Sequence, residues 1–261
     1  PRSTLFPYTT LFRSSAGSVW TNALGGAWSE AGNWSVAPAA DASASVLFGG
    51  AISAPATVTT GSGATLGYMA VDSANAYTWS GGALTLGSAE SNGAVRVTQG
   101  SHTVDAGLAL PSSASLQVDV GAALQVNGAV TGTGSLQVTG GGTVALTNGA
   151  SVAVPVTVSG ATLAMPQSTA YGAAFTLGAG GATFAPAAGR TVTLSSSVDG
   201  SGGLTKTGSS ILTLAGGAAF GGELVVRNGT VSLASEPSGT LVIGEGTLSY
   251  TGPDAVFARG Y

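Results

Sequence analysis

The sequence predicts an all-β protein that folds as a parallel β-helix, or β-solenoid, with coils of about 20 residues. Three observations predict it. The 261 residues include 43 glycines, only 7% of the residues are charged, and short alternating apolar triplets recur along most of the chain. Helical spacing of apolar residues is rare, because Gly or Pro interrupts most longer runs. The hydrophobic fraction of 44% argues against a disordered chain.

Residues 1–14 differ in composition from everything that follows. The stretch TLFPYTTLFRS, residues 4–14, is rich in bulky and aromatic side chains. It matches the translation of a common sequencing adaptor in one reading frame. We interpret residues 1–14 as a sequence artefact without ordered structure and exclude their side chains from any candidate site.

Residues 15–80 are predicted to form a Trp-rich N-terminal cap and the first coils. An open solenoid end would expose the core and unpaired strand edges, and large aromatic side chains can close it. An exposed platform that stacks on sugar rings is the alternative interpretation. The aromatic residues concerned are Trp20, Trp28, Trp34, Trp79, Tyr68 and Tyr77.

Residues 81–261 are predicted to form the β-helical stalk. Its triplets are bounded by Gly, Asn, Ser or Ala, the residues expected at turns between strands. From Val126 on, every second triplet recurs after about 17 to 20 residues, and one such period is one coil of two or three strands. The triplets amount to roughly six to nine coils. Examples are LTL at 84–86, VRV at 95–97, LQV at 116–118, 124–126 and 136–138, and VTV at 156–158.

Stacked coils explain the low charge of the chain. Equivalent residues of successive coils would lie about 5 Å apart, so that like charges would repel, whereas outward Thr, Ser, Gln and Asn form neutral ladders. The competing architecture is an antiparallel sandwich, which spaces its turns at 8–12 residues without a coil-length repeat. The coil-length period favours the solenoid.

A known repeat is recognisable in residues 200–233, GSGGLTKTGSSILTLAGGAAFGGELVVRNGTVSL. This segment resembles a passenger-associated transport repeat of bacterial autotransporters. Two departures are visible: Ala218–Phe220 replace the usual Asn-x-Tyr, and Glu223-Leu224 replace a Thr pair. The opening WTNALGGAWSEAGNW, residues 20–34, is similar to the starts of large passengers. The matching repeat positions are Gly202, Gly203, Leu204, Lys206, Gly208, Leu212, Leu214, Gly221, Val225, Asn228, Gly229 and Thr230.

The resemblance implies a right-handed β-helix that is exported across the inner membrane and then across the outer membrane of a Gram-negative bacterium. A C-terminal β-barrel translocator would carry the passenger to the cell surface or the extracellular space. No barrel-like strands precede the last residues, DAVFARGY, so we interpret the chain as a fragment truncated at its C-terminus. A host surface or a polysaccharide is the expected ligand, and we expect a monomer.

Composition excludes several other classes of partner. The net charge is −4 and the chain has a single lysine, so we expect no nucleic acid and no anionic membrane surface as partner. Cysteine is absent, which excludes disulfides and Cys-ligated metals. No run of 18 apolar residues and no signal peptide is present in this sequence.

No catalytic, cofactor-binding or metal-binding residue is predicted. Ser101, His102 and Asp105 lie close together in sequence, but no G-x-S-x-G turn presents a nucleophile, and we expect His102 to be an exposed corner residue. One histidine without cysteine does not make a zinc site. DGSGG at 199–203 occurs once and lacks the tandem repetition of a calcium-binding nonapeptide.

Carboxylates decide between the functional hypotheses. Asp105 with Asp119, and Glu223 with Glu245, are the pairs that would suit a glycosidase if they met within about 5 to 10 Å. The leading hypothesis is a non-enzymatic passenger fragment, a surface-displayed stalk or adhesin-like scaffold. The alternatives are a β-helix carbohydrate-active domain, which needs a carboxylate cluster on one face, and a surface-layer or biofilm matrix repeat protein, which needs another anchor downstream.

Overall fold

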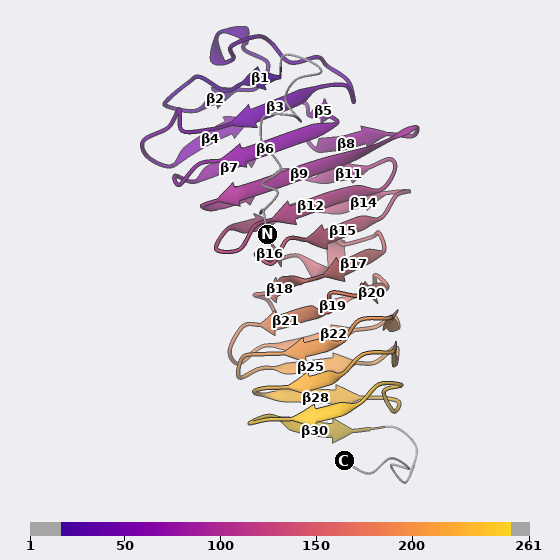
Figure 1. The fold of residues 1–261 in the computed structure, drawn as a ribbon. Coiled ribbons are helices and arrows are strands. Elements are labelled where there is room, and N and C mark those ends of the chain that lie inside the picture. Colours follow the sequence, from indigo (N-terminus) through magenta and orange to yellow (C-terminus); the bar gives the residue numbers. More distant parts are fainter. Residues whose placement is uncertain (1–16, 252–261) are drawn as a thin grey trace, which may run out of the picture.

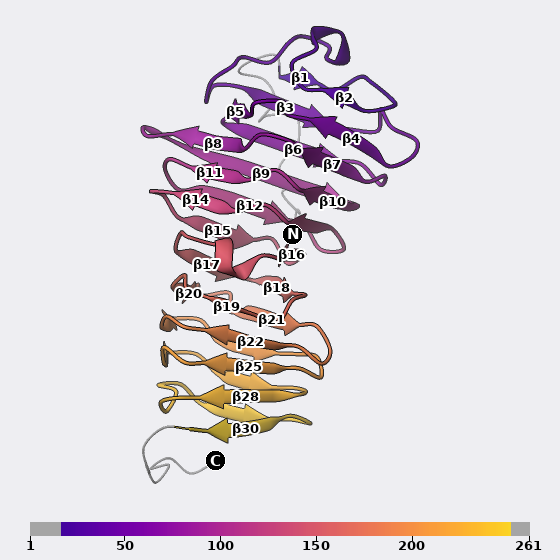
Figure 2. The same ribbon diagram turned by 180° about the vertical axis from the view of Figure 1, so that it is seen from behind.

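Runs of alternating apolar and polar residues form short strands, and Gly-rich turns join these strands into coils that stack one upon another (Figure 1). The computed structural model describes residues 17–251. The stack has about 10 turns of roughly 21 residues each, and the described part of the chain is 2% helical. The view from behind shows the same order of coils, from the indigo N-terminal end to the yellow C-terminal end (Figure 2). The predicted fold class and coil length are confirmed.

Complete coils have one strand on each of three faces, called face 1, face 2 and face 3 in chain order. Face 1 comprises β1 (Ser18–Val19), β3 (Ser45–Phe48), β6 (Tyr68–Asp72), β9 (Ser91–Gln99), β12 (Ala114–Val118), β15 (Leu136–Thr139), β17 (Val156–Ser159), β20 (Phe175–Leu177), β23 (Val198–Gly200) and β26 (Ala218–Phe220). Face 2 comprises β2 (Gly26–Ala27), β4 (Ala56–Thr59), β7 (Tyr77–Ser80), β10 (Ser101–Val104), β13 (Ala123–Val126), β16 (Thr143–Leu146), β18 (Ala161–Met165), β21 (Ala182–Pro186), β24 (Leu204–Lys206), β27 (Leu224–Val226) and β29 (Leu241–Ile243).

Face 3 consists of two parallel stacks. The first stack comprises β5 (Ala64–Leu66), β8 (Leu84–Ser88), β11 (Leu108–Leu110) and β14 (Val130–Gly132). The second comprises β19 (Thr169–Tyr171), β22 (Thr191–Leu194), β25 (Ile211–Leu214), β28 (Thr230–Leu233) and β30 (Thr247–Tyr250). Between the two stacks, the 3-10 turn η2 (Gly149–Ser151) and a bridge from Val130 to Val152 continue the face. A second 3-10 turn, η1 (Ala31–Asn33), lies near the N-terminal end.

Inward side chains form continuous apolar columns. On face 1, Leu116 pairs with Val138, Val138 with Val158, and Val158 with Leu177. All four side chains are buried. Because equivalent residues lie one coil apart and strands are about 4.8 Å apart, each apolar side chain packs on its copy above and below. The core is therefore a rod that runs along the whole stack.

Strand pairing rules out the antiparallel sandwich. In residues 17–251 the strand pairs are parallel, except for one hairpin in which Gly87 of β8 pairs with Asn92 of β9 and Ser88 with Ser91.

The predicted number of coils, six to nine, is too low. Residues 45–80 already contain strands β3, β4, β6 and β7, whose Ser, Thr and aromatic content hides the alternating triplets.

Candidate functional sites

Three tryptophans close the N-terminal end of the solenoid. Trp20, Trp28 and Trp34 are 1%, 8% and 5% exposed. The Trp34 ring meets Trp20 edge to face at 5.0 Å, Trp28 at 4.9 Å and Phe48 of the first full coil at 5.4 Å. The Trp34 indole N–H donates to the Trp28 carbonyl at 2.8 Å. These rings pack on one another and on the core, and do not form an exposed platform for sugar stacking.

The aromatic packing continues into the second and third coils. Tyr77 and Trp79 alternate inward on β7 and are fully buried, whereas Tyr68 starts β6 and is half-buried. The Tyr77 hydroxyl donates to the Gly49 carbonyl at 3.0 Å, and burial raises the pKa of Tyr77 to about 12. Tyr77 therefore keeps its proton at physiological pH and serves as a buried donor.

The expectation of an exposed His102 is wrong. His102 is 1% exposed, because β10 begins at Ser101 and the strand alternation turns the second residue into the core. Its Nδ1 accepts the backbone N–H of Tyr77 at 3.1 Å, so Nε2 carries the proton and donates to the Gln99 carbonyl at 2.9 Å. Burial lowers the pKa of His102, and the ring is held neutral.

Ser101, His102 and Asp105 do not form a catalytic triad. Ser101 and Asp105 are exposed, whereas the His102 ring points into the core. The Asp105 carboxylate accepts a hydrogen bond from the Asn127 side chain of the next coil at 2.6 Å. In a catalytic triad the base contacts both the nucleophile and the orienting acid, and these three residues do not have that arrangement.

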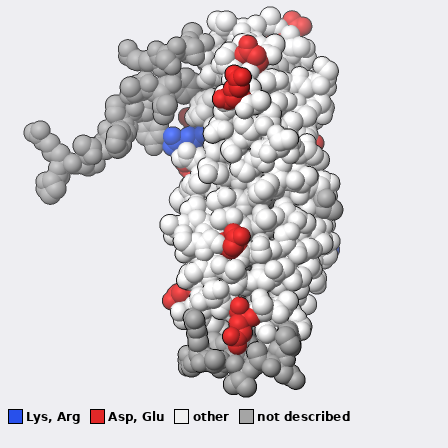
Figure 3. Space-filling view, turned by 90° about the vertical axis from the view of Figure 1, so that its right-hand side faces the viewer, with Lys and Arg blue, Asp and Glu red and all other residues white. Residues whose placement is uncertain are grey.

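The two carboxylate pairs are separated by strands of face 2. Asp105 follows β10 and Asp119 precedes β13, so they lie at opposite ends of this face. Glu223 precedes β27, whereas Glu245 follows β29, again at opposite ends. In Figure 3 the acidic side chains are scattered over the visible face. Among the described residues, no three His, Cys, Asp or Glu side chains form a group that could hold a metal ion.

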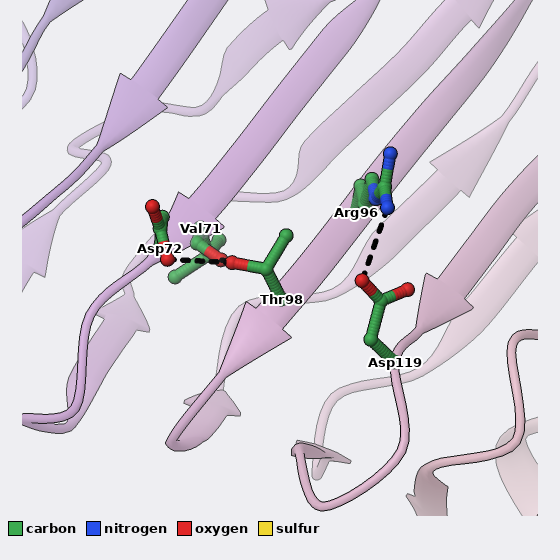
Figure 4. Close-up of polar contacts among 5 residues, drawn as sticks. All are labelled: Val71, Asp72, Arg96, Thr98 and Asp119. Carbon is green, nitrogen blue, oxygen red and sulfur yellow. Dashed lines mark hydrogen bonds and ion pairs between the residues drawn. The ribbon is translucent and has the colours of Figure 1, made fainter. Parts of the chain in front are cut away.

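Individual carboxylates instead link neighbouring coils at the corner between faces 1 and 2 (Figure 4). Asp119 accepts a hydrogen bond from the Arg96 guanidinium at 3.0 Å. Asp72 accepts one from the Thr98 hydroxyl at 2.7 Å. It accepts another from the Gln99 side chain at 2.8 Å. These contacts tie one coil to the next, which is a structural role.

Two residues of segment 200–233 have specific places in the fold. Lys206 is fully buried at the end of β24, one coil after Phe184 and one coil before Val226 in an inward column of face 2. Its Nζ donates to the carbonyls of Thr207 at 2.8 Å, Gly208 at 2.7 Å and Asn228 at 3.2 Å. Three acceptors match the three protons of the ammonium group.

Sequence reasoning placed Lys206 in the repeat motif but assigned it no position in the core. The signal was present, since Lys206 is the third residue of the triplet LTK, and its counterparts in the two neighbouring coils, Phe184 and Val226, are apolar. Burial lowers the pKa of Lys206 to about 8. Gly202 precedes this strand where a Cβ would overlap the Gly178 carbonyl of the previous coil.

A polar groove runs along the corner between faces 1 and 2. It has a volume of about 510 Å³ and crosses several consecutive coils. Its floor is formed by glycines at the same corner of four coils: Gly141, Gly160, Gly181 and Gly203. Two residues later, Thr162, Thr183 and Thr205 stand in one ladder, and Thr143 continues it. Glu223 takes the glycine's place in the next coil and closes one end.

Comparison of the chain with protein-family models, with curated proteins and with solved structures finds no match. In residues 17–251, no helix has the length and apolar character needed to span a membrane.

Proposed function

We propose that this chain is part of an autotransporter passenger, a non-enzymatic β-helical stalk displayed at the surface of a Gram-negative bacterium. The observation that carries the proposal is the sequential order of pairing. Each coil forms its parallel pairs with the coil before it and the coil after it in the chain. A polypeptide that emerges from a narrow pore can fold in this way, because every new coil finds its template already in place.

The segment 200–233 supports the same proposal. It resembles a transport repeat, and its Lys206 and Gly202 have roles that a surface motif would not require. The buried lysine joins the turn after β24 to the turn after β27, one coil further on. In the proposed function this repeat stabilises coils near the translocator end.

The complete gene provides the test. We expect an encoded signal peptide upstream and a C-terminal β-barrel downstream of residue 261. A surface-layer anchor or another attachment module in that place would overturn the autotransporter assignment and would leave the solenoid and its role as a scaffold.

A display experiment tests the proposal independently of the gene sequence. Residues 17–251, fused between a signal peptide and an unrelated autotransporter barrel, should reach the surface of intact cells and become accessible to added protease. A matched fusion that carries Gly229→Ala, whose added Cβ would overlap the carbonyl oxygens of Gly208 and Ser210 in the previous coil, should show less surface material. Retention of the parent fusion in the periplasm would contradict the proposal.

A further inference from the structure

We propose that the groove between faces 1 and 2 binds an uncharged, extended polysaccharide that lies along the solenoid axis. This inference adds a ligand to the proposed surface-displayed stalk and rests on that function.

The groove repeats one structural unit with the rise of the coils. The pattern Gly-x-Thr occurs at the same position in four successive coils, at 141–143, 160–162, 181–183 and 203–205. Each unit exposes a stretch of backbone at its glycine and one hydroxyl at its threonine. Adjacent units are about 4.8 Å apart. A site with this translational repeat suits a ligand that itself repeats.

Unused hydrogen-bonding groups line the groove. Thr162, Thr183 and Thr205 are half-buried, and their hydroxyls make no hydrogen bond within the part of the chain that the structure describes. Each hydroxyl can donate one bond and accept two, as sugar hydroxyls also do. The exposed carboxylate of Glu223 at one end can accept from two neighbouring hydroxyls of a sugar ring.

Charge and spacing exclude the other extended polymers. The lining residues include no Lys, Arg or His and one Glu, in a chain of net charge −4, so that polyanionic glycans and nucleic acids are repelled. An extended peptide presents side chains on one side every two residues, about 6.7 Å apart, which does not match the coil rise. A chain of equatorially linked pyranose rings advances by about the height of one coil for each ring. The volume lies within the range of ligand sites.

Binding of purified residues 17–251 to hexasaccharides tests this inference. The probes are cellohexaose, mannohexaose, xylohexaose and hexa-N-acetylchitohexaose, all extended and uncharged, with maltohexaose as the matched control because it has the glucose units of cellohexaose in a curved chain. We expect at least one extended probe to bind about tenfold more tightly than maltohexaose, measured by NMR titration, given three additional hydrogen bonds.

Two variants assign the binding to the groove. The triple variant Thr162→Val, Thr183→Val, Thr205→Val keeps β-branched side chains and removes the hydroxyls, and we expect about a tenfold loss of affinity. Gly160→Asn fills the floor at a position where a Cβ meets nothing within 4 Å and where Asn tolerates the left-handed backbone. The control variant Thr193→Val, Thr213→Val removes the equivalent ladder of face 3 and should bind normally.

The outcomes separate this inference from the proposed function. Absence of binding to all four extended probes, equal binding of maltohexaose, or full affinity in the triple variant would each overturn the groove as a polysaccharide site. Surface display of the fusion protein would then still support the stalk. A failure of display with normal polysaccharide binding would contradict the stalk and leave the groove as a binding site.

Discussion

At the scale of single residues, one inward column of face 2 places a histidine and a lysine among mainly apolar side chains. His102 is followed, coil by coil, by Leu124, Val144, Leu163, Phe184 and Lys206. Buried polar groups are tolerated when every donor and acceptor has a partner. Backbone groups supply these partners. Three carbonyls accept from Lys206, whereas His102 accepts from the Tyr77 N–H and donates to the Gln99 carbonyl, so that each residue links its own coil to a neighbour.

Replacement of Lys206 should destabilise the C-terminal coils. Lys206→Ala leaves a cavity and three carbonyls without their donor, and we expect a loss of about 3–5 kcal/mol of unfolding free energy. Lys206→Met keeps the volume and should lose about 1–3 kcal/mol, so the difference isolates the cavity. Urea denaturation followed by circular dichroism measures both. A Met variant as stable as the parent would show that the carbonyl contacts contribute nothing.

His102 should make the N-terminal coils sensitive to acid. Its folded pKa lies below the value of 6.5 for a free histidine, so the unfolded chain binds the additional proton first as the pH falls. The stability that this residue contributes is fully present above pH 6.5 and is lost as the pH falls toward its folded pKa. The expected slope is at most about 1.4 kcal/mol per pH unit.

Urea midpoints between pH 7 and pH 5 measure this slope. The variant His102→Gln has no titrating ring and should show a flatter profile over the same range, where most carboxylates stay ionised. An unchanged slope in the Gln variant would assign the acid sensitivity to other groups.

At the scale of strands and turns, corners decide how closely successive coils approach. The turn between β27 and β28 contains Gly229 with φ +71°, and a Cβ there would overlap the carbonyl oxygens of Gly208 and Ser210 in the previous coil. Gly189 has nearly the same backbone conformation, φ +69°, but faces open space. A comparison of substitutions at the two glycines therefore separates the cost of backbone strain from the cost of steric overlap.

Alanine at these two glycines should have unequal effects. Gly189→Ala should cost about 1 kcal/mol, from the left-handed backbone alone. Gly229→Ala should cost at least about 2 kcal/mol more, because the backbone of two coils must separate. Thermal unfolding of the two variants compares them. Equal losses of stability would mean that the corner at Ser210 can shift to admit the added methyl group without an energetic cost.

Neutral ladders between strands should not tolerate charge. The triple variant Thr162→Glu, Thr183→Glu, Thr205→Glu places three carboxylates about 4.8 Å apart on face 2, and we expect a lower unfolding midpoint that rises again with added salt. The matched triple Gln variant carries no charge and should depend little on salt. A salt response of the same size in both variants would contradict electrostatic repulsion as the reason for the low charge content.

At the scale of the whole molecule, stability is a sum over neighbouring coils. Contacts join sequential coils, so a local defect should unfold nearby coils and leave distant ones intact. The Trp cap at one end and the apolar residues of β29 and β30 at the other are therefore energetically separate. Val242 and Ile243 of β29 are 40% and 47% exposed, in contrast to the buried cap.

Substitutions at opposite ends should reveal this separation. Trp34→Ala should weaken hydrogen-exchange protection in β3, β4 and β6, while β25 and β28 keep theirs. Phe220→Ala, a fully buried residue of β26, is the matched control and should give the reverse pattern. Protection lost along the entire chain in either variant would show that the solenoid unfolds as one cooperative unit.

Much of this architecture was readable from local patterns. Alternation of apolar and polar residues sets the strands, Gly and Asn set the corners, and the distance between triplets sets the coil length, because these properties depend only on neighbouring residues. The triplets around Leu116, Val138 and Val158 gave the coil period almost correctly. The cap region gave no such period, since its aromatic residues and irregular spacing hide the first coils.

The tertiary structure decided which way particular side chains point and which groups they contact. His102 was expected at an exposed corner and lies in the core, because the start of β10 is determined by pairing with β7 and β13. Lys206 finds one of its three acceptors, Asn228, a full coil away, and the groove exists only because four Gly-x-Thr units are stacked in register. Composition and period thus determined the coil, whereas contacts between coils, which depend on the exact register, determined the candidate site.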